Sequence, residues 1–213
     1  MKDLVKKQLI KDGFDESQIL LLAVSGGVDS MVMWSLVHKL GLKYAVAHVN
    51  FQLRKEQSDL DEELVSTIAE ERNIPCHILK SNTKKVAQDK SISIQMAARE
   101  IRYNWFTEIL EKENYDFLCT AHHLNDSIET FFINLDRGTG IRGLTGISAN
   151  NNILRPLITL TKEEIRNYAF EQELHFREDQ SNANNKYQRN WFRNSILSQW
   201  QKRNPAFSKT MSK

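Results

Sequence analysis

Short apolar runs alternate with longer amphipathic stretches along the chain. The apolar runs at residues 19–25, 44–50, 76–80, 117–121 and 153–157 have the length of buried strands. Helical spacing of apolar positions predicts helices at 30–40, 55–72, 94–112, 126–135 and 191–200, and Thr161-x-x-Glu164 has the spacing of a capping box that opens a helix to about residue 172. Strands that alternate with helices predict an α/β fold with an open, mostly parallel five-stranded sheet flanked by helices.

The chain shows no low-complexity linker and no repeat, and it has only three prolines. We therefore expect residues 1–213 to form a single domain, in which 179–213 are a basic C-terminal loop and helix. Residues 179–188 are the one polar irregular stretch and predict a surface loop before the last helix.

Composition narrows the class of protein. A chain with 40% hydrophobic and 26% charged residues is typical of soluble globular proteins. No segment approaches the roughly 18 apolar residues of a membrane span, and the N-terminus lacks the apolar core of a signal peptide. Cys76 and Cys119 are the two cysteines and form no CxxC pair, which argues against a zinc ribbon or a disulfide framework. A cytoplasmic protein without membrane contact is expected.

The net charge of +2 conceals an uneven distribution. No acid follows Asp179, whereas seven bases do: Lys186, Arg189, Arg193, Lys202, Arg203, Lys209 and Lys213. The preceding residues hold the other 22 bases and all 27 acids. A basic end on a neutral-to-acidic body is typical of a protein that binds a polyanion there, and a solvated, frayed terminus explains it equally well.

Candidate chemistry begins with the segment SGGVDS, between the first predicted strand and the first predicted helix. It consists of Ser25, Gly26, Gly27, Val28, Asp29 and Ser30. Two glycines let the backbone approach an anion, the helix N-terminus supplies unpaired N–H donors, and Asp29 is a candidate magnesium ligand. The segment lacks the lysine of GxxxxGK[ST] and does not match GxGxxG. A tight turn after a buried strand is the plain alternative. The segment resembles the pyrophosphate loop of the PP-loop ATP pyrophosphatases.

Further blocks occur in a fixed order. They are HVNFQLR (48–54), AAREIRY (97–103), TAHHLNDSIET (120–130), RGTGIRGL (137–144), RPL (155–157) and DQSNANNKYQRNWFR (179–193). Together they resemble the tRNA(Ile)-lysidine synthetases over nearly the whole chain. Phe51 stands where that family commonly has His, and the family's C-terminal tRNA-binding regions are expected to be absent.

The resemblance implies a reaction with ATP and magnesium. The wobble cytidine of an isoleucine tRNA with a CAU anticodon is adenylated at its C2 oxygen, and free L-lysine then attacks C2 and expels AMP. It implies ATP binding by residues 25–30 and His48, catalysis by Asp126, Arg102 and Arg193, lysine binding by Asp126 and Glu129, and tRNA or phosphate contacts by Arg99, Arg189 and Arg193. Asp126 and Glu129 are three residues apart on a predicted helix and share a face. A homodimer is a further expectation.

Other functions remain open. His122, His123, Asp126 and Glu129 are residue types that bind metals, but adjacent histidines at a strand end point to opposite faces. A PP-loop tRNA thiolase needs paired or exposed cysteines, which the chain does not offer. GMP and NAD synthetases share SGGxDS but not the HVNxxLR block. A non-catalytic nucleotide- or RNA-binding module would keep the glycine loop without needing both Asp29 and Asp126.

Overall fold

Five parallel strands form the sheet at the centre of the fold. The computed structural model describes residues 1–140, 152–178, 188–204 and 206–211. The strands are β1 (Leu20–Ala23), β2 (Tyr44–Asn50), β3 (Cys76–Lys80), β4 (Phe117–Cys119) and β5 (Ile153–Leu154). They lie in the order β3-β2-β1-β4-β5, and each pairs with its neighbours in parallel. The predicted α/β fold is confirmed, and the described sheet is parallel throughout rather than mostly parallel.

The direction of winding reverses between β1 and β4. The chain runs outward from β1 through β2 to β3 and then returns to β4 on the other side of β1. Loops that leave two neighbouring strands at such a switch point diverge and leave a crevice at the carboxyl ends of the strands. Residues 24–27 follow β1 and residues 120–123 follow β4, so the two polar motifs flank this crevice.

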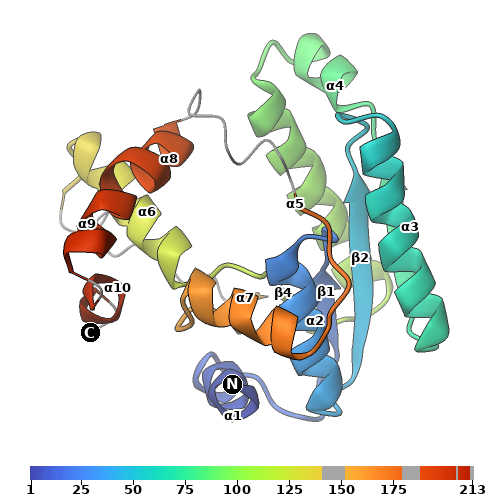
Figure 1. The fold of residues 1–213 in the computed structure, drawn as a ribbon. Coiled ribbons are helices and arrows are strands. Elements are labelled where there is room, and N and C mark those ends of the chain that lie inside the picture. The colour runs from blue at the N-terminus through green and yellow to red at the C-terminus, as the bar shows by residue number, and fades with distance from the viewer. Residues whose placement is uncertain (141–151, 179–187, 205, 212–213) are drawn as a thin grey trace.

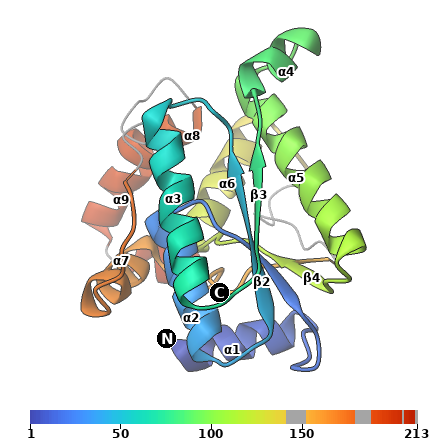
Figure 2. The same cartoon turned by 90° about the vertical axis from the view of Figure 1, so that its right-hand side faces the viewer.

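Helices cover both faces of the sheet (Figure 1). One face carries α1 (Lys2–Lys11), α2 (Val28–Lys39), α3 (Glu56–Glu71) and α7 (Lys162–Glu171), and α5 (Ile94–Lys112) packs on the other. Figure 2 shows α3 and α5 on opposite sides of β2 and β3. Successive side chains of a strand point to opposite faces, so Leu20 and Leu22 join the first core and Leu21 joins the core under α5.

A smaller core lies beside the sheet, around α6 (Leu124–Asp136). It contains α8 (Gln188–Trp191), the π-helical turn η3 (Phe192–Leu197), α9 (Ser198–Arg203) and α10 (Phe207–Thr210), which gather with α6 on one side of the molecule (Figure 1). Leu197 and Phe207 pack on Ile128, and the ring of Phe132 stacks on that of Phe192 with centroids 6.4 Å apart. The described part of the basic C-terminal region is therefore packed on the helix that carries Asp126 and Glu129.

Some element boundaries differ from the prediction. β5 ends at Leu154 rather than at residue 157, because Pro156 has no N–H for a strand ladder. The helical stretch predicted at 191–200 begins at Gln188, ends at Arg203 and contains a π-helical turn. Three helices were not predicted: α1, α10 and α4 (Thr83–Asp89), the last capped by the side chain of Asn82. The predicted loop at 179–188 and the 137–144 block lie partly outside the described residues, at 179–187 and 141–144.

Among the described residues, no helix is long and apolar enough to cross a membrane.

Candidate functional site

The glycine loop connects β1 to α2 in a conformation that only its sequence allows easily. Gly26 has a φ of +84°, a backbone conformation that residues other than glycine rarely adopt. Ser30 Oγ donates to the carbonyl oxygen of Gly27 at 2.8 Å and accepts from the N–H of Ser25 at 3.1 Å. Gly27 is the N-cap of α2 and brings no side chain to bond its first N–H groups. The loop therefore presents the N-terminus of a 12-residue helix to the crevice, a favourable place for an anion.

A cavity of about 700 Å³ opens in front of this loop. The glycine loop, the end of β2 and the start of α3 form its polar side, and α5 contributes Ala98 and Phe106. Of the residues predicted to bind ATP or act in catalysis, it is lined by Ser25, Gly27, Asp29, Ser30, His48 and Arg102. The cavity therefore joins the glycine loop to an apolar wall, an arrangement suited to a nucleotide.

His48 lies in the wall of this cavity with a defined protonation state. Its Nδ1 donates to the carbonyl oxygen of Val24 at 2.8 Å, so the neutral ring carries its proton on that nitrogen. Burial lowers the pKa of His48, and its Nε2 has no hydrogen-bond partner in the described structure. Since Nε2 bears a lone pair, it is an acceptor for an N–H group of a ligand.

Arg102 faces the same cavity from α5. Burial lowers the pKa of this guanidinium, and its Nε has no hydrogen-bond partner among the described residues. The ring of Phe51 lies 5.7 Å from the guanidinium, close enough for a cation–π contact. Phe51, which stands where the resembled family commonly has His, thus packs its ring against the guanidinium of Arg102. Arg99 lies one turn earlier but stacks on Tyr103 at 4.7 Å and does not line the cavity.

Asp29 forms the charged end of the glycine loop. Both of its carboxylate oxygens accept hydrogen bonds from Lys162 Nζ at 2.6 Å. Lys162 is the first residue of α7, and its backbone N–H donates to Asn125 Oδ1 at 2.9 Å. His123 Nε2 lies 3.9 Å from Asp29 on another side. Sequence reasoning missed Lys162, although it directly follows the capping residue Thr161.

Asp126 is held at the start of α6. One of its oxygens accepts from the backbone N–H of His123 at 3.0 Å, and His123 Nε2 lies 3.5 Å from the same carboxylate. Burial by itself raises the pKa of Asp126, but His123, His122 and Arg189 outweigh it, and the pKa is lowered. Asp126 is therefore ionised at neutral pH. His123 lies between Asp126 and Asp29, and so between α6 and the glycine loop.

Glu129 lies one turn further along α6 and is only 1% exposed. Arg193 donates to it twice, from Nε to Oε1 at 2.6 Å and from Nη2 to Oε2 at 2.9 Å. Although burial opposes the charge on Arg193, this bidentate contact raises its pKa. Arg189 Nε lies 3.2 Å from Glu129 Oε2 without the alignment of a hydrogen bond. Arg193 also lies 3.7 Å from Asp126.

Most of the predicted residues therefore fall into two groups. The first lines the cavity, and the second lies on α6 and the C-terminal helices without lining it: Asp126, Glu129, Arg189 and Arg193. Gly26, Val28 and Arg99 belong to neither group, although the first two are part of the glycine loop. His122 belongs to the cavity side: its Nδ1 lies 2.9 Å from Thr120 Oγ1, and burial lowers its pKa to about 4. His122 and His123 thus have different surroundings. Among the described residues, no cluster of three or more His, Cys, Asp or Glu could hold a metal ion.

A glycine loop between strand and helix, at the switch point of a parallel sheet, defines a nucleotide-binding α/β protein. The model of the PP-loop domain family matches residues 2–200, and the chain belongs to that family.

Similar proteins refine this assignment. The chain is 42% identical over 193 residues to the tRNA(Ile)-lysidine synthase of Bacteroides thetaiotaomicron, covering 90% of this chain and 45% of that protein. It is 36% identical over 208 residues to that of Porphyromonas gingivalis, covering 97% of this chain and 45% of the relative. The chain spans about half the length of these relatives.

Solved structures show the same fold at low identity. The U34-tRNA thiolase NcsA of Methanococcus maripaludis superposes with a TM-score of 0.80 at 18% identity, covering 98% of this chain and 75% of that one. An NH3-dependent NAD synthetase of Campylobacter jejuni superposes with a TM-score of 0.54 at 16% identity, covering 82% of this chain and 71% of that one. Identities this low support the fold alone.

Proposed function

We propose that this chain carries the catalytic site for ATP-dependent attachment of free L-lysine to C2 of the wobble cytidine in an isoleucine tRNA with a CAU anticodon. The relatives named tRNA(Ile)-lysidine synthase support the reaction. The observation that carries it is the junction at His123, which joins Asp29 of the glycine loop to Asp126 of α6. One carboxylate belongs to the ATP side and the other to the amine side, so both reaction partners meet near this junction.

The first step is adenylation. The C2 oxygen of the cytidine attacks the α-phosphorus of ATP, and the bond to the β-phosphate breaks to release pyrophosphate. The N–H groups of Gly27 and the first turn of α2 hold the departing phosphates, together with Ser25 and Ser30. The unpartnered acceptor His48 Nε2 binds an N–H of the nucleotide. Arg102, which has no acid bonded to it among the described residues, balances charge at the α-phosphate.

The second step is attack by lysine. The ε-ammonium must lose a proton before its nitrogen can attack C2, after which the C2–O bond breaks and AMP leaves with the oxygen. Asp126, ionised by its surroundings, binds the ammonium and accepts the proton. Glu129 was expected to bind lysine, but it is buried and Arg193 bonds both of its oxygens. We therefore assign Glu129 a positioning role, since it holds Arg193 3.7 Å from Asp126. Arg99, Arg189 and Arg193 carry the contacts to tRNA phosphates.

The residues fit a magnesium ion that binds together with the nucleotide. Magnesium keeps several waters and usually takes one or two carboxylates plus substrate phosphates. Asp29 supplies one carboxylate, and Lys162 shows that a cation is stable beside it. When bound, the metal neutralises the phosphate oxygens. With magnesium at Asp29, Lys162 would bond another acceptor.

The placement of the cysteines favours this ligase over a thiolase. Cys76 lies on β3 and Cys119 on β4, with β2 and β1 between them. Three strand spacings separate them by roughly 14 Å, too far for a shared persulfide or cluster. Cys119 is fully buried, and burial raises the pKa of its thiol. We place the reaction in the cytoplasm, and a homodimer remains a prediction.

Replacement of Asp126 tests the proposal. We expect Asp126→Ala to abolish lysine attachment to the tRNA and to leave the circular dichroism spectrum unchanged. Asp136→Asn, an exposed change at the last residue of the same helix, is the matched control and should retain activity. Near-normal lysine attachment by Asp126→Ala contradicts the assignment.

A further inference from the structure

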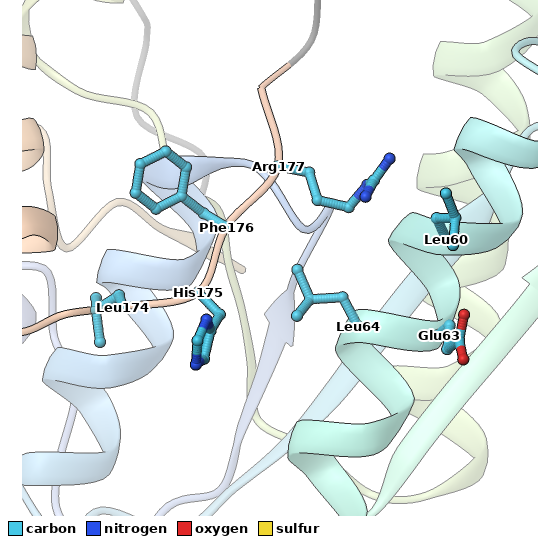
Figure 3. Close-up of a pocket in the computed structure, with 7 residues that line it drawn as sticks. All are labelled: Leu60, Glu63, Leu64, Leu174, His175, Phe176 and Arg177. Carbon is cyan, nitrogen blue, oxygen red and sulfur yellow. The ribbon is translucent and has the colours of Figure 1, made fainter.

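Three charged residues beside the glycine loop have no part in the mechanism above. Arg54 lies between β2 and α3, Asp61 lies in the second turn of α3, and Arg177 belongs to the segment that follows α7. Arg54 and Asp61 both line the 700 Å³ cavity. Arg177 lines a separate hollow between α3 and residues 174–177, where its guanidinium points toward α3 (Figure 3).

Asp61 bonds both arginines. Arg54 Nη2 donates to its Oδ2 at 2.5 Å, and Arg177 Nε donates to its Oδ1 at 2.8 Å. The Asp61 side chain is 9% exposed, so the carboxylate is largely withdrawn from water. Two guanidiniums therefore converge on one carboxylate. Because the carboxylate is buried and bonded on both oxygens, it fixes where the two cations lie.

This cluster touches the glycine loop. A Cβ placed on Gly26 would lie 3.5 Å from both the Cβ and the carbonyl oxygen of Asp61. The backbone N–H of Arg177 donates to the carbonyl oxygen of Gly26 at 3.0 Å. Asp61 therefore packs directly on the loop, and Arg54 enters the cavity at the loop end rather than at the wall formed by α5.

The loop itself lacks a cation. Its six residues contain one charged side chain, the acid Asp29. A departing pyrophosphate gathers several negative charges, which backbone N–H dipoles and hydroxyls neutralise only in part. Guanidinium groups are suited to this task because their planar N–H donors can bond two phosphate oxygens at once.

We propose that Arg54 binds the β- and γ-phosphates of ATP and the pyrophosphate that leaves, and that Asp61 is the positioning residue that aims Arg54 at the loop. This proposal rests on the nucleotide site of the proposed function but does not require tRNA or lysine. It assigns a phosphate-binding role to the arginine of the HVNFQLR block and explains why an acid stands beside a phosphate site.

Calorimetric titration with ATP, pyrophosphate and AMP, each with magnesium, tests the proposal. We expect Arg54→Gln to lower the affinities for ATP and for pyrophosphate by the same factor, roughly ten- to a hundredfold. That is the usual effect of losing a charge-assisted hydrogen bond. AMP binding should be unchanged, since AMP lacks the contacted phosphates. Arg166→Gln removes a guanidinium from the exposed side of α7 and is the matched control.

A double-mutant cycle tests the positioning role. Asp61→Asn should lower the affinity for pyrophosphate less than Arg54→Gln does. The double variant should bind pyrophosphate no more weakly than Arg54→Gln alone. Fully additive losses contradict the positioning role of Asp61.

Three results overturn the phosphate assignment: unchanged pyrophosphate affinity in Arg54→Gln, an equal loss of AMP affinity, or loss of tRNA affinity in its place. Wild-type protein that binds pyrophosphate through Arg54 but attaches no lysine leaves this inference intact and refutes the proposed function. Wild-type protein that binds no ATP refutes both.

Discussion

Replacement of Gly26 by alanine separates a backbone effect from a functional one. At a φ of +84° an alanine Cβ approaches its own backbone, which costs about 1–2 kcal/mol. The nearest other atoms lie 3.5 Å from that Cβ, an ordinary contact, so no steric clash adds to the cost. The loss of flexibility in the unfolded chain returns about 0.4–1 kcal/mol. We therefore expect Gly26→Ala to lower the free energy of unfolding by about 1 kcal/mol.

Gly41→Ala is the matched control for this change. Gly41 has a φ of +71° after α2, and a Cβ there would meet no atom within 4 Å. Urea denaturation should give a similar loss in the free energy of unfolding for both variants. Thermal unfolding should show a fall in Tm of about 2–4 °C for a chain of this size. Only Gly26→Ala should lower the affinity for ATP, by roughly tenfold or more, because the strained residue must shift the N–H groups of the loop. Gly26→Ala protein that binds ATP like wild type refutes a phosphate-binding role for this loop.

Two further predictions follow from the charges of the site. Lys162→Met should tighten the binding of Mn²⁺ to Asp29 in the absence of nucleotide by roughly fivefold, because a partly exposed ion pair contributes about 1 kcal/mol. Unchanged Mn²⁺ affinity in a titration followed by electron paramagnetic resonance contradicts this. The pKa of His122 is lowered to about 4 in the folded protein. The unfolded chain therefore binds the extra proton as the pH falls from about 6.5 to 4, and stability falls by up to about 3 kcal/mol. His122→Asn should remove that part of the pH dependence of urea unfolding, and an unchanged pH profile would refute it.

Local patterns in the sequence were enough to predict the sheet. The run at Leu20–Ala23 is apolar along its whole length because both faces of a parallel strand are covered, and that signature does not depend on distant residues. The glycine loop was equally predictable, because two adjacent glycines between a predicted strand and a predicted helix indicate a sharp turn, and Gly26 has a φ of +84°. The family model that matches residues 2–200 confirms the predicted resemblance to PP-loop proteins.

Contacts between distant segments could not be predicted in this way. Lys162 bonds Asp29 across 133 positions, and Arg177 bonds Asp61 across 116. Nothing near Lys162 in the sequence distinguishes it from an ordinary exposed lysine at a helix start. Glu129 was expected in the lysine pocket from its spacing to Asp126, but the spacing gives no sign that Arg193 bonds both of its oxygens. Only the packing of the C-terminal helices on α6 brings those two residues together.

The most direct measurement of the central claim follows labelled lysine. The chain is incubated with magnesium, radiolabelled L-lysine and unmodified isoleucine tRNA with a CAU anticodon, with and without ATP. We predict that label enters the RNA only with ATP, that one AMP is released for each lysine attached, and that a tRNA whose wobble base is not cytidine gains no label. Labelling without ATP, or ATP binding with no lysine in the RNA, would contradict the account.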